Sequence, residues 1–184
     1  KQETKVALAE ASGRAKSNEA GHKREMTKVL ERHDRTDARW LDYEIDIAKL
    51  LDFPLMTDMR DPLTIAFHKA KSHADWLRPD SVDDILGDRN AQLEYRDAVG
   101  EYVAAFDVAE SEAIRRRRSD FSAEARERLE RAQHLLRLAS DSGATPQERQ
   151  SAYRKAQKEL EGLILLPPSM RAQIERHIAG QIEA

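Results

Sequence analysis

Four consecutive arginines form the strongest charge feature of the sequence. Guanidinium groups bind phosphates and carboxylates, so Arg115, Arg116, Arg117 and Arg118 are a candidate surface for anionic lipid or nucleic acid. Four successive residues, however, point in all directions around a helix, and cations at a helix C-terminus favour the helix dipole. We therefore favour a structural role for the four arginines, at the C-terminal end of a helix. Because no aromatic residues alternate with the arginines, nucleic-acid binding is further disfavoured.

Histidines and carboxylates give little indication of a metal site. One Glu-x-x-His pair occurs, Glu19 with His22, whereas helical bundles that bind two metal ions use two such pairs on inward-facing helices. The acidic segment 80–88 lacks the spacing of a calcium-binding loop, and helix starts explain it better. The sequence contains no Gly-rich phosphate loop and no Ser/His/Asp set. We therefore predict no metal, no cofactor and no catalytic residues.

The third candidate is an apolar segment, LLDFPLMTDMRDPLTIAFHKA, at residues 50–70. It carries large apolar side chains around two prolines, where a simple turn needs only small polar residues. These side chains either close the end of a helical bundle, which is the commoner role, or form a docking surface for a protein. Methionine suits docking because its flexible side chain repacks around varied partners. The predicted partner-binding residues are Trp40, Phe53, Leu55, Met56 and Met59.

Helical periodicity runs through most of the chain that must position these residues. Between Met26 and Leu51, apolar residues recur at steps of three and four, which predicts one long helix. Pro54 ends this helix, because proline lacks the backbone N–H and clashes with the preceding turn. The pair Asp61-Pro62 suits the start of a second helix, and Arg78-Pro79 its end.

Helix caps divide the rest of the chain. In DSGATPQE (141–148), Thr145 can cap a helix that begins at Pro146, and Glu148 completes the capping box. No segment shows the period of two that strands require. The sequence therefore predicts an all-α fold, an elongated antiparallel bundle or coiled-coil-like hairpin with a long N-terminal helix. The later helices are predicted over 88–118, 122–139, 146–164 and 169–182.

Composition separates the N-terminus from the rest. Residues 1–25 contain only two large aliphatic residues, Val6 and Leu8, which predicts a solvated helical arm or stalk before a bundle domain at 26–184. Charged residues make up 35% of the 184 residues and the net charge is -3, so no global attraction to polyanions is expected. The chain has no cysteine, which excludes disulfides and thiolate chemistry.

Three loop signatures carry a resemblance to a known group. RWLDYE (39–44), TDMRDPLTIAFH (57–68) and GLILLPP (162–168) resemble the soluble helical portion of uncharacterised actinobacterial proteins, in which membrane-spanning segments precede a charged helical stalk. The resemblance covers roughly residues 30–175. It implies a cytoplasmic location and a tether to the inner membrane through a segment that precedes Lys1. It implies no functional residues.

Together these features predict a non-enzymatic adaptor or scaffold module that binds another protein. A second copy of the chain, paired through the N-terminal helix, and an anionic membrane are further candidate partners. The first alternative is a binder of anionic membrane or nucleic acid through Arg115–Arg118. The second is an enzyme whose polar groups come together from distant positions. The residues that would line its pocket are Asp61, His68 and Tyr102.

Overall fold

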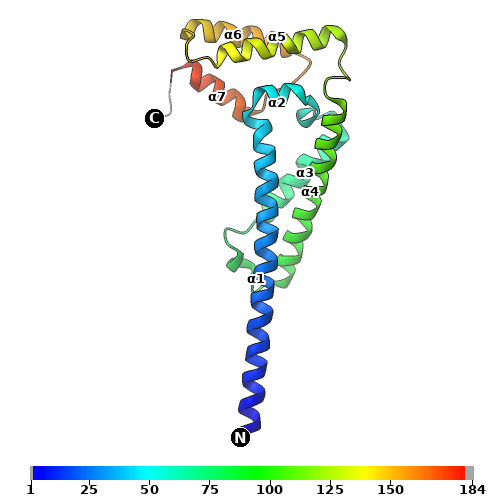
Figure 1. Cartoon of the computed structure of the whole chain (residues 1–184), viewed down its shortest axis with the longest axis vertical. Helices are drawn as coiled ribbons and strands as arrows, with labels where there is room; N and C mark the ends of the chain where they lie inside the picture. Colours follow the sequence, from blue (N-terminus) through cyan, green and yellow to red (C-terminus); the bar gives the residue numbers. More distant parts are fainter. Residues whose placement is uncertain (1, 181–184) are drawn as a thin grey trace. The chain divides into compact units, whose positions relative to one another are not determined.

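The structure is a computed structural model that describes residues 2–180, with the side chains of residues 12–14 and 16–180. Within residues 2–180 every regular element is helical, which confirms the all-α prediction (Figure 1). The chain packs into two compact units. Unit 1 comprises the chain up to Asp37 and Phe67–Phe106, and unit 2 comprises Ala38–Ala66 and the chain from Asp107 onward. The domain division predicted from the sequence, an arm at 1–25 and a bundle domain at 26–184, stays a prediction.

The unit boundaries fall inside three of the helices, α1, α3 and α4. None of the helices within residues 2–180 combines the length and the apolar character that a membrane span requires. The elements are α1 (Gln2–Ile45), α2 (Ile47–Asp52), the 3-10 helix η1 (Pro54–Thr57), α3 (Pro62–Leu77), the 3-10 helix η2 (Val82–Ile85), α4 (Arg89–Arg116), α5 (Ala123–Ala139), α6 (Pro146–Leu160) and α7 (Pro168–Ile178).

Helix α1 runs through the segment predicted as a solvated helical arm, where the described side chains before His22 are exposed. It differs from its prediction at the C-terminal end. The helix predicted to reach Leu51 breaks at Asp46, which has an extended backbone. The Asp46 carboxylate accepts a hydrogen bond from the Lys49 backbone N–H at 3.1 Å and so begins α2 as a new helix.

Unit 1 has an aromatic core. Phe67 of α3 stacks on Tyr102 of α4 with ring centroids 6.1 Å apart, and it meets Phe106 edge-on at 5.2 Å. All three rings are fully buried. The buried amide of Gln92 donates to two successive carbonyl oxygens at the end of η2, both at 2.9 Å, and so fixes that short helix to α4. Aromatic packing thus determines how α3 and α4 meet in this unit.

Unit 2 is organised by a helical hairpin. Helices α5 and α6 lie side by side (Figure 1), and small residues at their contact allow close approach. The predicted capping box starts α6, because the Thr145 hydroxyl and the Glu148 carboxylate bond each other's backbone N–H groups. Helix α7 covers the hairpin with three apolar residues. The core of unit 2 includes Leu129, Ala132, Leu136, Ala139, Ala152, Tyr153, Ala156, Leu160, Met170, Ile174 and Ile178.

Candidate functional site

A partly buried polar cluster lies in unit 1, around His33 of α1. The His33 ring is fully buried, and its Nδ1 atom hydrogen-bonds the hydroxyl of Tyr95 at 3.0 Å. Its Nε2 atom lies 3.0 Å from a carboxylate oxygen of Asp75 and 3.6 Å from one of Asp37. Tyr102 donates its hydroxyl to Asp37 at 3.0 Å. These five residues, with the two cations described next, form what we call the His33 cluster.

Two cations neutralise the carboxylates of this cluster. The Lys71 ammonium lies 3.2 Å from Asp37 and 2.8 Å from Asp75. Arg78 contacts Asp37 at 3.3 Å and Asp34 at 2.5 Å. Burial lowers the pKa of Lys71, but its hydrogen bonds and charge attraction to Asp75 and Asp37 outweigh burial and raise the pKa overall. Lys71 is therefore a fixed positive charge and a poor proton acceptor.

The His33 cluster has the donor atoms for a metal ion but not an open site. His33, Asp37 and Asp75 each offer a ligand atom within 4.8 Å of the others. A metal ion bound there would have to displace Lys71, which already contacts both carboxylates. Burial also raises the pKa of Tyr95 to about 12, so its phenol stays protonated at neutral pH. The arrangement is that of an internally neutralised core that links α1, α3 and α4.

The arginine run at the end of α4 is also largely neutralised, in this case within unit 2. Arg115 donates to Glu112 at 2.7 and 2.6 Å, and Arg116 bonds the same carboxylate. Arg116 also pairs with Asp61 at 3.0 Å, next to the start of α3. Hydrogen bonds from Arg115 and Arg116 lower the pKa of Glu112 to about 2.

The last arginine of the run binds the C-terminal end of α2. Arg118 donates to the backbone carbonyl of Leu51 at 2.9 Å and to the carboxylate of Asp52 at 3.0 Å. Arg117 has a left-handed backbone, with φ 49°, and its guanidinium lies 5.7 Å from the centre of the Phe53 ring. Three of the four arginines thus have carboxylate partners within unit 2, which leaves less charge for the predicted anionic surface.

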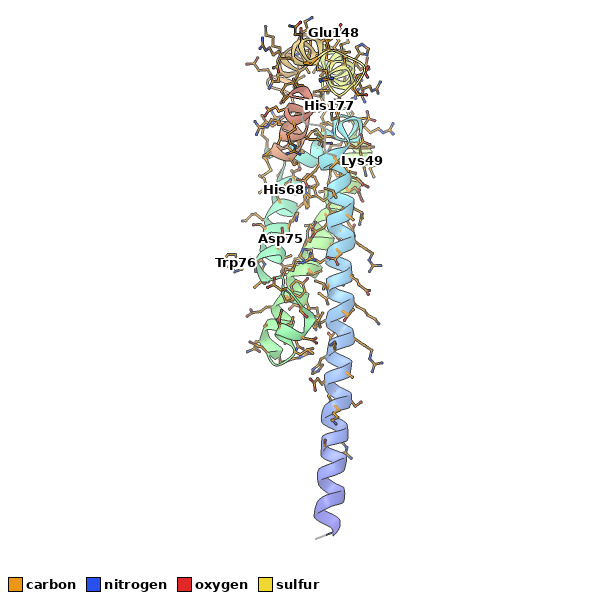
Figure 2. The ribbon with its side chains drawn as sticks, turned by 90° about the vertical axis from the view of Figure 1, so that its left-hand side faces the viewer. Lys49, His68, Asp75, Trp76, Glu148 and His177 are labelled. Atoms are coloured by element: carbon orange, nitrogen blue, oxygen red, sulfur yellow. The ribbon has the colours of Figure 1, made fainter. Side chains whose placement is uncertain are left out.

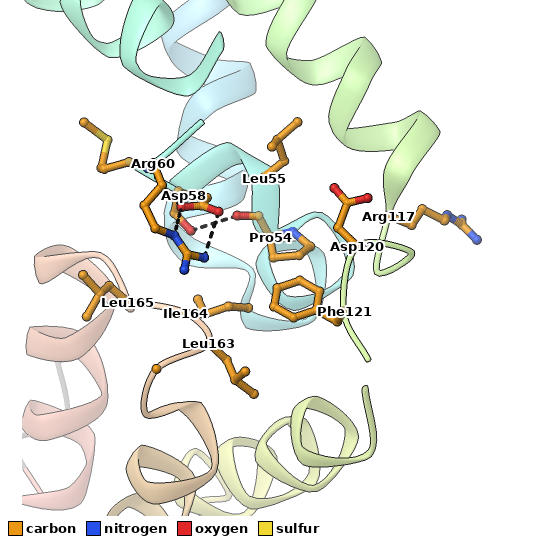
Figure 3. Close-up of a pocket in the computed structure, with 13 residues that line it drawn as sticks. Pro54, Leu55, Asp58, Arg60, Arg117, Asp120, Phe121, Leu163, Ile164 and Leu165 are labelled. Carbon is orange, nitrogen blue, oxygen red and sulfur yellow. Dashed lines mark hydrogen bonds and ion pairs between the residues drawn. The ribbon is translucent and has the colours of Figure 1, made fainter. Parts of the chain in front are cut away.

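The surface of unit 2 has an apolar groove of about 430 Å³ (Figure 3). Pro54, Phe121 and Ile164 face one another across it (Figure 3). On its rim, Arg60 binds the Asp58 carboxylate through two nitrogens at 2.8 and 3.0 Å, so these charges satisfy each other. We call it the Phe121 groove. Its other lining residues are Leu55, Thr57, Met59, Arg117, Asp120, Gly162, Leu163 and Leu165.

A second groove of about 740 Å³ lies between α6, the following loop and the start of α7, also in unit 2. We call it the Tyr153 groove. Its floor is apolar, and its rim carries three cations and one carboxylate. The floor residues include Tyr153, Leu160, Ile164, Leu166 and Pro168, and the charged residues are Arg154, Lys158, Arg171 and Glu161.

Leu165 belongs to both grooves. Its side chain is 82% exposed, although its neighbours Ile164 and Leu166 are buried. Gly162 ends α6 with φ 75°, a left-handed backbone that suits glycine, and so turns the chain away from the helix axis. The backbone N–H of Ile164 then donates to the Leu160 carbonyl at 3.1 Å and fixes the loop. Leu165 is therefore presented to solvent on a well-anchored loop.

The five residues predicted to bind a partner separate into buried and exposed members. Trp40 and Met56 are buried in unit 2, which favours a packing role, and partner binding by these two residues stays a prediction. Leu55 is buried too, but it lines the floor of the Phe121 groove. Phe53 is half-buried below Arg117. Met59, 55% exposed, lies on the groove itself.

Phe121, Leu163 and Leu165 are surface candidates that the sequence did not lead us to predict. A signal was present in GLILLPP, where four large apolar residues stand between a glycine and two prolines, in a run too short for a further helix. Helical periodicity alone indicates only a helix end in this segment. Alternation along it buries Ile164 and Leu166 and exposes Leu165 between them.

The three residues named for an enzyme pocket have other roles. Asp61 caps α3 through the Leu63 backbone N–H at 2.8 Å and pairs with Arg116. Tyr102 belongs to the His33 cluster. The ring of His68 lies against Phe67, with centroids 4.3 Å apart. Each of these side chains thus has a structural neighbour that accounts for its position.

No family model, no curated protein and no solved structure matches this chain. The resemblance to actinobacterial membrane-anchored proteins therefore stays a prediction. The geometry and charge of the residues described above are what indicate a function.

Proposed function

We propose that this protein is a non-enzymatic interaction module that binds a segment of another protein chain through unit 2. The observation that carries the proposal is Leu165, an 82% exposed leucine that lines two apolar-floored grooves. A single exposed leucine needs no explanation, but one that adjoins two grooves gives a partner's side chains a place to be buried.

The size of the surface suits a peptide segment. Grooves of about 430 and 740 Å³ fall in the range of sites that hold a few side chains. Complete burial of a leucine side chain contributes about 1.5–3 kcal/mol, and Met59 and Leu163 beside it can add to this. These are the proportions of an interface anchored by a few apolar residues with a polar rim.

The surface is also supported from below. Ile164 and Leu166 belong to the buried core of unit 2, and Tyr153 and Leu160 connect the Tyr153 groove to the same core. A surface held by a packed core loses little conformational freedom when it binds, which favours affinity. The His33 cluster offers no comparable surface, because its charges are neutralised inside unit 1.

Binding of an anionic membrane or of nucleic acid through Arg115–Arg118 has less support. Arg115, Arg116 and Arg118 are bonded to carboxylates of unit 2. Among the described side chains, Arg117 of this run has no carboxylate partner, and one cation gives weak attraction to a polyanion. The membrane tether and cytoplasmic location implied by the resemblance stay predictions that accompany this proposal.

A display experiment tests the proposal even though the partner is unidentified. A random peptide library is selected on the purified protein, and the enriched peptides are measured against Leu165→Asp. We expect this substitution to weaken binding roughly tenfold or more, which corresponds to about 1.4 kcal/mol. The matched control is Trp76→Ser in unit 1, because Trp76 is 85% exposed and extends outward from α3 (Figure 2).

The control variant should bind the peptides as the wild type does. Both variants should keep the wild-type melting temperature within a few degrees, since both side chains are exposed. The proposal is wrong if no peptide is enriched, or if the enriched peptides bind Leu165→Asp with unchanged affinity.

A further inference from the structure

We infer that the partner segment is acidic and that the Tyr153 groove recognises it. The inference rests on the proposed function and specifies its partner. Three cations line this groove, Arg154, Lys158 and Arg171, against one carboxylate, Glu161. The lining therefore has a formal excess of positive charge above an apolar floor, although the whole chain has a net charge of -3.

These three cations differ from several arginines of unit 2 that form ion pairs. Arg131 lies 3.2 Å from Glu159, and Arg39 lies 2.8 Å from Asp107. The three groove cations, in contrast, are exposed and form no ion pair with any of the described side chains. Their charge is thus directed to solvent at the groove and is free to attract a ligand of opposite charge.

The geometry of α6 and α7 places the three cations around one floor. Arg154 and Lys158 are four residues apart on α6 and therefore share a helix face. Arg171 lies in the first turn of α7 and lines the same groove. Arginine binds carboxylates through two parallel hydrogen bonds, so two arginines and a lysine can hold two or three carboxylates of one segment.

The apolar floor selects among anionic ligands. A free phosphate would satisfy the cations but leave Leu160, Ile164 and Leu166 without a partner. A planar bilayer surface does not follow a concave groove. A peptide that carries aspartate or glutamate beside a leucine or similar side chain satisfies both parts, with the apolar side chain on the floor and beside Leu165. The chemistry therefore favours an acidic amphipathic segment.

The test uses three labelled synthetic peptides that share one leucine pattern. The first carries glutamate at the flanking positions, the second glutamine and the third lysine. Fluorescence anisotropy should show that the glutamate peptide binds the wild type roughly tenfold or more tightly than the glutamine peptide, with weaker binding at high salt. The lysine peptide should not bind.

Protein variants then test whether the three groove cations recognise the glutamate peptide. The triple variant Arg154→Gln/Lys158→Gln/Arg171→Gln should lose the preference for glutamate over glutamine. A charge-reversed variant, Arg154→Glu/Lys158→Glu, should bind the lysine peptide instead, which a merely destabilised protein would not do. The matched control makes the same change in net charge on unit 1. It replaces three exposed cations by glutamine, Lys28, Arg32 and Lys69.

The outcomes distinguish this inference from the proposed function. If the triple glutamine variant binds the glutamate peptide as the wild type does while Leu165→Asp does not, acidic recognition is wrong and the docking surface stands. If Leu165→Asp has no effect either, both are wrong. Binding of anionic vesicles that requires Arg154, Lys158 and Arg171, without binding of the glutamate peptide, would replace the peptide by a lipid surface.

Discussion

The His33 cluster of unit 1 and the Tyr153 groove of unit 2 use charge in opposite ways. In the cluster, Asp37 and Asp75 both contact Lys71, and Tyr102 completes the bonding of Asp37. In the groove, cations stand over an apolar floor, without ion pairs among the described side chains. Residue types alone would make the cluster the better candidate for chemistry. Because the charges of the cluster are paired with one another and the cations of the groove are not, the groove is the better candidate for binding a ligand.

The energetics of the two regions differ for the same reason. The charged side chains of the cluster are partly shielded from solvent around the buried His33 ring, and removal of one of them leaves its hydrogen-bond partners unsatisfied, so the cluster stabilises the fold as a set. An exposed cation is solvated and costs little when unpaired, so a groove can keep its charges for a ligand. Substitutions in the cluster should therefore reduce stability, and substitutions at the groove should reduce binding.

The largest effect is expected from Asp37→Ala. Asp37 accepts hydrogen bonds from Lys71, Arg78 and Tyr102, and its removal leaves these groups without their shared acceptor. We expect the free energy of unfolding to fall by about 3 kcal/mol, measured by urea denaturation. The control is Asp97→Ala, an exposed carboxylate paired with the neighbouring Arg96, which should change stability by less than about 0.5 kcal/mol.

Equal effects of Asp37→Ala and Asp97→Ala would contradict this contrast between the two regions. The cluster would then not be a set of mutually dependent charges, and its residues would be open to another role. A fall in stability that is confined to Asp37→Ala would support its structural assignment.

A smaller loss of stability is expected from Arg118→Ala. This change removes bonds to the Leu51 carbonyl, Asp52 and Gln133, and should lower the free energy of unfolding by about 1–2 kcal/mol in the same assay. The control is Arg126→Ala, an exposed arginine of α5 without an ion pair among the described side chains, which should have almost no effect.

This pair of variants decides whether the arginine run stabilises the fold or binds an anionic ligand. Unchanged stability in Arg118→Ala, together with loss of binding to anionic vesicles, would show that the run binds an anionic surface and does not stabilise the fold. That result would favour membrane binding over the binding of a peptide segment.

Local patterns predicted the helices well, because caps and periodicity act over a few residues. The capping box of Thr145 with Glu148 is present as the sequence indicated, and a second one, of Ser81 with Asp84, begins η2 within the acidic segment 80–88 that was attributed to helix starts. The break at Asp46 was missed, since a periodic apolar pattern continues through it and only the cap reveals a new helix. Helix existence was therefore predictable, and this boundary was not.

The candidate site was far less predictable, because burial and charge pairing depend on distant parts of the chain. Met56 and Met59 are the same residue type three positions apart, yet Met56 is fully buried and Met59 is exposed. His33 pairs with Asp75, 42 positions away, and Arg116 with Asp61, 55 positions away. No local pattern distinguishes a neutralised arginine from one such as Arg154, whose charge remains free for a ligand.

The smallest expected effect concerns the acid titration of Glu112. Its pKa in the folded protein is lowered from 4.5 to about 2 by Arg115 and Arg116, so the ionised form favours folding. The stabilisation is complete above about pH 4.5 and is lost as the pH falls towards 2. Carboxyl NMR should show a titration midpoint near pH 2 for Glu112, and Arg116→Gln should raise it towards 4.5.

Arg154→Gln provides the control for this titration, because Arg154 has no bond to Glu112 and its replacement should leave the midpoint unchanged. A wild-type midpoint near 4.5 would mean that Glu112 does not hold Arg115 and Arg116 in solution. Arg115 would then resemble the unpaired cations of the Tyr153 groove, whereas Arg116 would keep its pairing with Asp61. The charge available to an anionic surface at the end of α4 would increase accordingly. The titration thus measures directly whether pairing separates the two kinds of arginine in this protein.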